Sequence, residues 1–203
     1  MRKLHFFTGI IITVFTGLHL FNHAWSLFGA DVHIALMNDL RIVYRNVFVE
    51  TILLAAVFIQ LLSGLKLYGQ HRKTAVSFFD KLHVWTGLYL AMFFLFHVGA
   101  VMAGRFILHL DTNYYFGGAG LVTFPFSLFF IPYYSLAVIS FFGHIAAVHS
   151  KKMSKNVAGI SPAVQAKIML FAGVFFTALL MFALTNRFQG VEIPEAYNVM
   201  IGK

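Results

Sequence analysis

The sequence predicts an all-α membrane protein, a polytopic bundle of about five transmembrane helices with a cytoplasmic N-terminus. Three observations predict this class. Apolar residues make up 60% of the 203 residues, charged residues only 11%, and the mean hydropathy is +0.80. Five apolar stretches are each long enough to cross about 30 Å of hydrocarbon at about 1.5 Å per residue. Lysine and arginine lie in short clusters beside the ends of these stretches.

Polar connections separate the five predicted spans. The first span follows Met-Arg-Lys, and we interpret it as a retained anchor because it runs past twenty residues without a convincing cleavage site. Pro125 and Pro132 interrupt the fourth span, so we expect an irregular start near residues 123–125 and a helix from about Ile131. No repeat or linker divides the chain, which we expect to form one transmembrane domain. The spans are residues 5–28, 47–69, 82–104, 121–149 and 164–186.

The charge distribution predicts the orientation. With the N-terminus inside, ten of the fifteen Lys and Arg residues fall on the cytoplasmic side, so the positive-inside rule predicts an N-in, C-out protein of a bacterial inner membrane. Because this charge flanks spans, nucleic-acid binding is a poor interpretation. The composition excludes a disordered chain and a soluble enzyme domain. The lack of cysteine excludes disulfides, thiolate nucleophiles and iron–sulfur clusters on this chain.

Several of the ten histidines lie at membrane depth, where an ionisable side chain is a functional-site hypothesis by default. The alternative for each one is a neutral imidazole bonded to a neighbouring helix. His83 and His97 lie fourteen residues apart in the third span, which places them about 40° apart around the helix and about 21 Å apart along it. One helix with this spacing can serve two b haems, because a bis-histidine haem takes one imidazole from each of two facing helices.

Depth predicts the partners of these two histidines. His19 of the first span matches the level of His97, so we predict that this pair holds an outer haem, with His23 as the reserve ligand. His83 and His144 lie near the inner side and can hold an inner haem.

The other histidines are weaker candidates. His71 is a reserve for the inner pair, although we expect His71 and His149 to be solvated interface residues. His5, His33 and His109 sit at span ends or in connections, where we do not expect ligands.

Four charged residues are candidates on the outer side. Arg41, Arg45 and Arg105 can pair haem propionates through their bidentate guanidinium groups, or they can simply extend to the interface. Glu50 lies near the outer end of the second span and is a candidate for a quinone site or for proton transfer. Its alternative is an interface residue paired with Arg45 or Arg41.

The end of the first span, TGLHLFNHAWSLFG, resembles the first-helix pattern of the five-helix cytochrome b membrane anchors of succinate dehydrogenases and fumarate reductases. The resemblance covers most of the chain in length, number of spans and orientation. It implies that His19 and His97 are the outer ligands and that His144 is the fourth-span ligand. The second span departs from the family because it contains no histidine, and the arrangement of His83 and His97 instead looks like that of quinol-oxidising b cytochromes.

The resemblance implies an electron-transfer subunit with one b haem, or two, and quinone as substrate. Flavoprotein and iron–sulfur protein subunits would bind the basic cytoplasmic face, and membrane lipid would surround the spans. Such a chain would not itself oxidise succinate. We weigh this hypothesis against a stand-alone b-haem quinol-linked oxidoreductase and against a haem-free transporter, channel or assembly protein. Few intramembrane carboxylates and no internal repeat argue against the last class.

Overall fold

Long apolar helices make up most of the protein. The computed structural model describes residues 1–203, and five of its helices are long and apolar enough to cross a membrane. The predicted class, an all-α multi-pass membrane bundle, is therefore confirmed. The five are α1 (Arg2–Ala24, continued by the 3₁₀ helix η1, Trp25–Phe28), α3 (Val47–His71), α4 (Phe78–Phe106), α6 (Ser127–Lys152) and α7 (Pro162–Leu184); the shorter elements are α2 (Ala30–Tyr44), α5 (Tyr114–Val122) and the 3₁₀ helix η2 (Glu195–Ile201).

The fourth membrane-length helix differs from the expectation at its start. Residues 123–126 form a turn, as predicted, but α6 already begins at Ser127 and contains Pro132 within it. Pro132 has no N–H to donate, so one bond of the helical ladder is missing. Membrane helices tolerate proline because neighbouring helices and local adjustment satisfy the freed backbone groups. The helix therefore continues through Pro132 where we expected it to begin only at Ile131.

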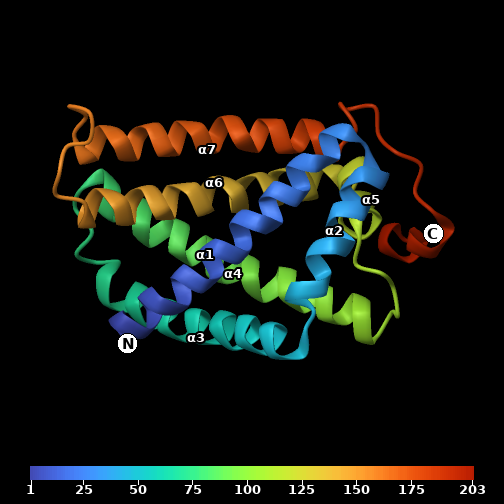
Figure 1. Ribbon diagram of the computed structural model, residues 1–203, viewed down its shortest axis with the longest axis horizontal. Helices are drawn as coiled ribbons and strands as arrows, with labels where there is room; N and C mark the ends of the chain where they lie inside the picture. Colours follow the sequence, from blue (N-terminus) through green and yellow to red (C-terminus); the bar gives the residue numbers. More distant parts are fainter.

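The five long helices are arranged in a ring. Around the ring the order is α1, α3, α4, α6 and α7, and α7 closes it by contacting α1. Figure 1 shows α6 and α7 running side by side, with α1 inclined across the bundle. The helices α1 and α4 lie across the ring from each other and have no extended backbone contact. Side chains of these two helices can therefore meet only across the interior.

The polar connection between the first two spans folds as α2, which runs across the direction of the bundle (Figure 1). His33 and Met37 are buried on its inward face, and the side chain of Arg41 is only 10% exposed. Its outward face exposes Ile42 and Val43. The inward residues recur every four positions, which is one face of a helix. From the sequence we expected only a polar connection here.

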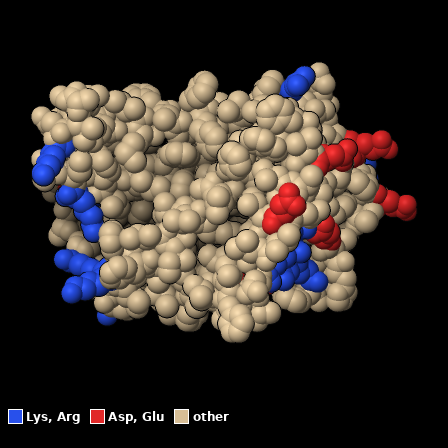
Figure 2. Space-filling view, viewed as in Figure 1, with Lys and Arg blue, Asp and Glu red and all other residues tan.

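Charge divides between the two ends of the bundle. The end that holds the N-terminus and the α3–α4 and α6–α7 connections carries ten of the fifteen Lys and Arg residues and a single carboxylate, Asp80. In Figure 2 the acidic side chains appear only at the opposite end. The two ends therefore differ strongly in electrostatic potential.

Glycines allow close packing at several helix contacts. A Cβ on Gly173 of α7 would lie 2.3 Å from Cβ of Phe142 on α6, well inside van der Waals contact. A Cβ on Gly69 of α3 would meet nothing within 4 Å. Small residues at such contacts let membrane helices approach closely, so α6 and α7 depend on Gly173 for their spacing.

Substituting Gly173→Ala is expected to lower the stability of the folded protein by about 1–3 kcal/mol, because the added methyl group forces α7 away from Phe142. Thermal unfolding in detergent measures the effect. Gly69→Ala is the matched control and should be neutral or slightly stabilising, since alanine favours a helix over glycine by about 1 kcal/mol. Equal stability of the two variants would contradict this account of the α6–α7 contact.

Candidate functional site

Two histidines meet across the interior of the ring. The ring centroids of His19 on α1 and His97 on α4 are 6.1 Å apart, with their planes at 66°. Both side chains are half-buried. Because α1 and α4 are not packed together, these imidazoles are a direct link between the two helices. These are the two residues that we predicted as a pair because they lie at equal depth in the membrane, and their role as ligands stays a prediction.

Each of these two histidines lies on a phenylalanine one turn earlier in its helix. His19 stacks on Phe15 with a centroid separation of 5.8 Å, and His97 stacks on Phe93 at 4.9 Å. Neither phenylalanine was among the residues predicted from the sequence. The signal was present, because FTGLH and FFLFH share a phenylalanine four residues before the histidine.

A chain of imidazoles extends from His19 toward α2. Nε2 of His23 lies 3.1 Å from Nε2 of His19, and Nδ1 of His23 lies 3.2 Å from Nε2 of His33. His33 is 1% exposed, although the sequence suggested only a connection there. Burial lowers the pKa of His33 to about 4, with a smaller effect from nearby Arg41 and His19. His33 is therefore neutral at neutral pH and holds α2 against α1 through hydrogen bonding rather than charge.

The second pair forms near the basic end. The ring centroids of His83 on α4 and His144 on α6 are 4.4 Å apart, and the planes are tilted by 41°. The hydroxyl of Thr86 donates to the carbonyl of Leu82 at 2.5 Å, so its oxygen accepts from Nδ1 of His144 at 3.3 Å. Lys151 donates to Nδ1 of His83 at 3.4 Å. Hydrogen bonds, rather than stacked rings, therefore orient this pair.

His5, His71 and His149 have partners outside these pairs, His149 through Gln165 at 2.8 Å. Nδ1 of His5 bonds to Ser63 at 2.8 Å, and Gln60 donates to Nε2 of the same ring at 3.1 Å. His71, the reserve for the inner pair, contacts Arg2 at 3.3 Å and no other histidine. Both nitrogens of His5 are used, so its hydrogen bonds hold α1 against α3.

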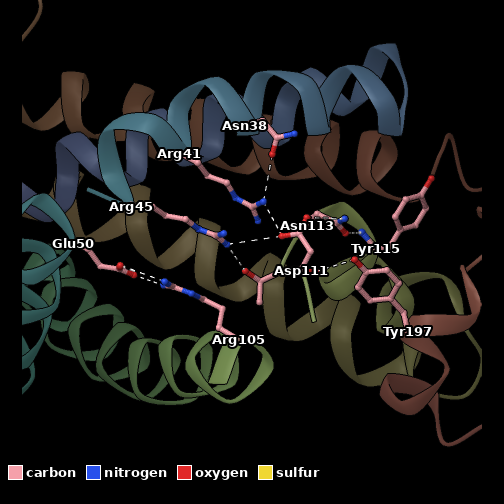
Figure 3. Close-up of polar contacts among 10 residues, drawn as sticks. Asn38, Arg41, Arg45, Glu50, Arg105, Asp111, Asn113, Tyr115 and Tyr197 are labelled. Carbon is pink, nitrogen blue, oxygen red and sulfur yellow. Dashed lines mark hydrogen bonds and ion pairs between the residues drawn. The ribbon is translucent and has the colours of Figure 1, made fainter. Parts of the chain in front are cut away.

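Ion pairs occupy the charged candidates on the outer side (Figure 3). Arg105 binds both carboxylate oxygens of Glu50, so the partner of Glu50 is Arg105 and not Arg41 or Arg45. Arg41 lies 2.7 Å from Asp111.

The guanidinium group of Arg45 lies 3.0 Å from the hydroxyl of Thr112 and 4.0 Å from the carboxylate of Asp111. Figure 3 shows Asp111 beside Arg41 as well. Nε of Arg41 is buried and has no partner. Burial and neighbouring Arg41 lower the pKa of Arg45, although it stays charged. Arg41 thus keeps one buried donor that the protein does not use.

The geometry of the two pairs can be compared with the needs of a haem. An imidazole nitrogen lies about 2.0–2.1 Å from a bound metal such as zinc. When two imidazoles bind one metal from opposite sides, these two bonds and the distances from each nitrogen to its ring centre place the ring centroids roughly 6 Å apart. The outer pair, at 6.1 Å, fits this requirement, and the inner pair, at 4.4 Å, does not without moving apart. If Nε2 of His19 were to hold an iron, it would give up its bond to His23, and the contact of His23 with His33 through Nδ1 would remain available.

No group of three or more His, Cys, Asp or Glu residues is arranged to hold a metal ion by itself. A haem differs from such a site because the protein supplies only the axial ligands. No family model, curated protein or solved structure matches the chain, so its family resemblance is a hypothesis that rests on the residues.

Replacing Glu50 with Gln is expected to destabilise the fold by about 1–3 kcal/mol, because the partly buried Arg105 guanidinium loses its carboxylate partner. Chemical or thermal unfolding in detergent measures the change. Asp39 provides a control, since it is exposed and forms no ion pair, and Asp39→Asn should change stability by less than about 0.5 kcal/mol. A Glu50→Gln protein as stable as the Asp39→Asn protein would show that the α3–α4 ion pair contributes nothing.

Proposed function

We propose that this chain is a membrane cytochrome that holds a b haem between His19 and His97 and passes electrons between quinone and a dehydrogenase. The observation that carries the proposal is the 6.1 Å separation of these two rings, on helices that have no extended backbone contact. Imidazoles are costly at membrane depth, and a shared ligand is one reason for two helices to supply one each.

The side chains around the pair have distinct roles in this proposal. His19 and His97 bind as axial ligands, and the buried, unpartnered Nε of Arg41 is available to a carboxylate such as a haem propionate. When bound, the haem supplies one-electron transfer, with a potential that the protein tunes through ligands and burial. Phe15 and Phe93 surround the ligands with apolar rings, which limits water there.

The ends of the bundle suggest where partners bind. Under the positive-inside rule, the basic end faces the cytoplasm of a bacterium, so the N-terminus is inside and the C-terminus outside. Its exposed cations favour an acidic protein surface, and we assign this face to the flavoprotein and iron–sulfur subunits of a succinate or fumarate enzyme. The quinone reaches the bundle from the lipid. Glu50 is already paired with Arg105, which argues against a free carboxylate in a quinone site.

One observation favours a haem-free function as the second candidate. The chain from His19 through His23 to His33 is a row of hydrogen-bonded imidazoles, which a proton carrier or transporter also uses. The two candidates differ in whether a pigment accompanies the purified protein.

A reduced-minus-oxidised spectrum of the purified protein tests the proposal. We expect a sharp b-type α-band in the parent, and its loss in both His19→Ala and His97→Ala because a single axial ligand does not hold the haem firmly. His109 is exposed on a connection, so His109→Ala is a matched control that should keep the parental spectrum. A colourless parent protein would refute the cytochrome and leave the haem-free candidate.

Haem content distinguishes one site from two. We expect about one haem per chain, because the rings of His83 and His144 are too close to clamp an iron as they stand. His83→Ala should then leave the outer haem and its α-band unchanged. A content near two, with one haem lost in His83→Ala, would show that the inner pair opens to take a second haem.

Charge reversal at the basic end tests the partner. Arg72→Glu combined with Lys155→Glu should slow haem reduction by succinate in membranes several-fold, because both side chains are exposed on the proposed docking face. The defect should shrink as salt screens the surface charges. Lys203→Glu at the opposite end is the control, and an equal defect in that variant would argue against docking at the basic end.

A further inference from the structure

Each of the two outer imidazoles lies parallel to a phenylalanine of its own helix, and His19 is also hydrogen-bonded to His23. The planes of Phe15 and His19 differ by only 17°, and those of Phe93 and His97 by 13°. In a helix, side chains lean toward the N-terminus, so a ring lies over the residue four positions earlier. Each phenylalanine ring is therefore nearly parallel to the ring of its histidine, more closely for Phe93 than for Phe15, and restricts rotation of the imidazole about its χ2 bond.

Tyrosines from neighbouring helices hold the phenylalanines themselves. Tyr44 of α2 meets Phe15 edge-on, with centroids 5.5 Å apart and planes at 82°. Tyr134 of α6 meets Phe93 edge-on, at 6.1 Å and 77°. Edge-to-face contacts of this kind are favourable arrangements for aromatic rings. Each outer histidine thus belongs to a cluster of three rings, in which the phenylalanine is parallel to the histidine and a tyrosine of a second helix meets the phenylalanine edge-on.

The inner pair has no such arrangement. Phe79 precedes His83 by four residues, but its ring contacts Phe78 and not the histidine. Ser140 occupies the corresponding position before His144. The stacked phenylalanines are therefore specific to the pair whose spacing fits a haem, and they are not a general feature of histidines in this bundle.

We propose that Phe15 and Phe93 are positioning residues that fix the planes of the two axial imidazoles at a steep angle to each other. This inference rests on the proposed function. It means that the 66° angle between the ring planes of His19 and His97 is set by the two phenylalanines and not by the binding of iron. Residues behind the ligands of a metal commonly set ligand orientation in this way. The angle matters because axial imidazole planes set the splitting of the iron d orbitals.

Low-temperature EPR of the oxidised protein tests this role, because the lowest-field g value of low-spin ferric haem follows the angle between the imidazole planes. We expect Phe15→Leu and Phe93→Leu each to shift that feature by more than its linewidth, since leucine offers no flat surface. Phe93→Tyr keeps the stacked ring and should restore the parental signal. Phe96→Leu is the matched control, because Phe96 lies on the same helix and is 60% exposed.

The outcomes separate this inference from the function on which it depends. A parent protein without haem refutes the proposed function. A parent with haem whose signal is unchanged in both leucine variants overturns the positioning role and leaves the cytochrome intact. If Phe93→Leu loses its haem, Phe93→Tyr decides: recovery of haem with the parental signal supports the role, and recovery with a shifted signal overturns it.

Discussion

The cost of placing imidazoles in hydrocarbon is the constraint on which this bundle depends. A polar ring without a hydrogen-bond partner is costly at membrane depth, and the partners of His5 and His144 come from other helices. His5 of α1 is hydrogen-bonded to Ser63 and Gln60 of α3. His144 of α6 is hydrogen-bonded to Thr86 of α4. These contacts join neighbouring helices in the ring. The contact between His19 and His97 is different, because it connects α1 and α4, two long helices that are not neighbours in the ring.

Two kinds of force orient the two histidine pairs. A phenylalanine stacks on each ring of the outer pair, in which only His19 is also hydrogen-bonded, whereas hydrogen bonds to a hydroxyl and an ammonium orient the inner pair. A stacked ring restricts rotation of the imidazole without using a nitrogen, and His97 in fact makes no hydrogen bond within the structure. A hydrogen bond uses a nitrogen and selects a tautomer. Lys151 only donates, so at His83 it favours a proton on Nε2, the nitrogen that an iron would need. His97, whose two nitrogens are both free, is therefore better suited to coordination than His83.

Much of the fold followed from hydropathy, because length and apolar composition suffice to locate spans. The five long helices end within a few residues of the predicted limits, apart from α6, where Pro132 proved compatible with a helix. Segment 30–44 was harder, since its mixed composition suggested a connection and its helical form depends on burying His33 and Met37. At the site, equal depth was enough to bring His19 opposite His97. The choice of Arg105 as the partner of Glu50 depends on where α4 ends, which hydropathy leaves open.

The crosswise helix α2 also makes the environment of the outer histidines asymmetric. It covers the bundle on the acidic side, and its inward face places His33 against His23 and Tyr44 against Phe15. Water-soluble molecules arriving from that side meet α2 first, whereas the flanks between the long helices border the bilayer. If these rings hold a haem as proposed, a redox partner dissolved in the lipid would approach it between the long helices, and α2 would separate it from water on the acidic side.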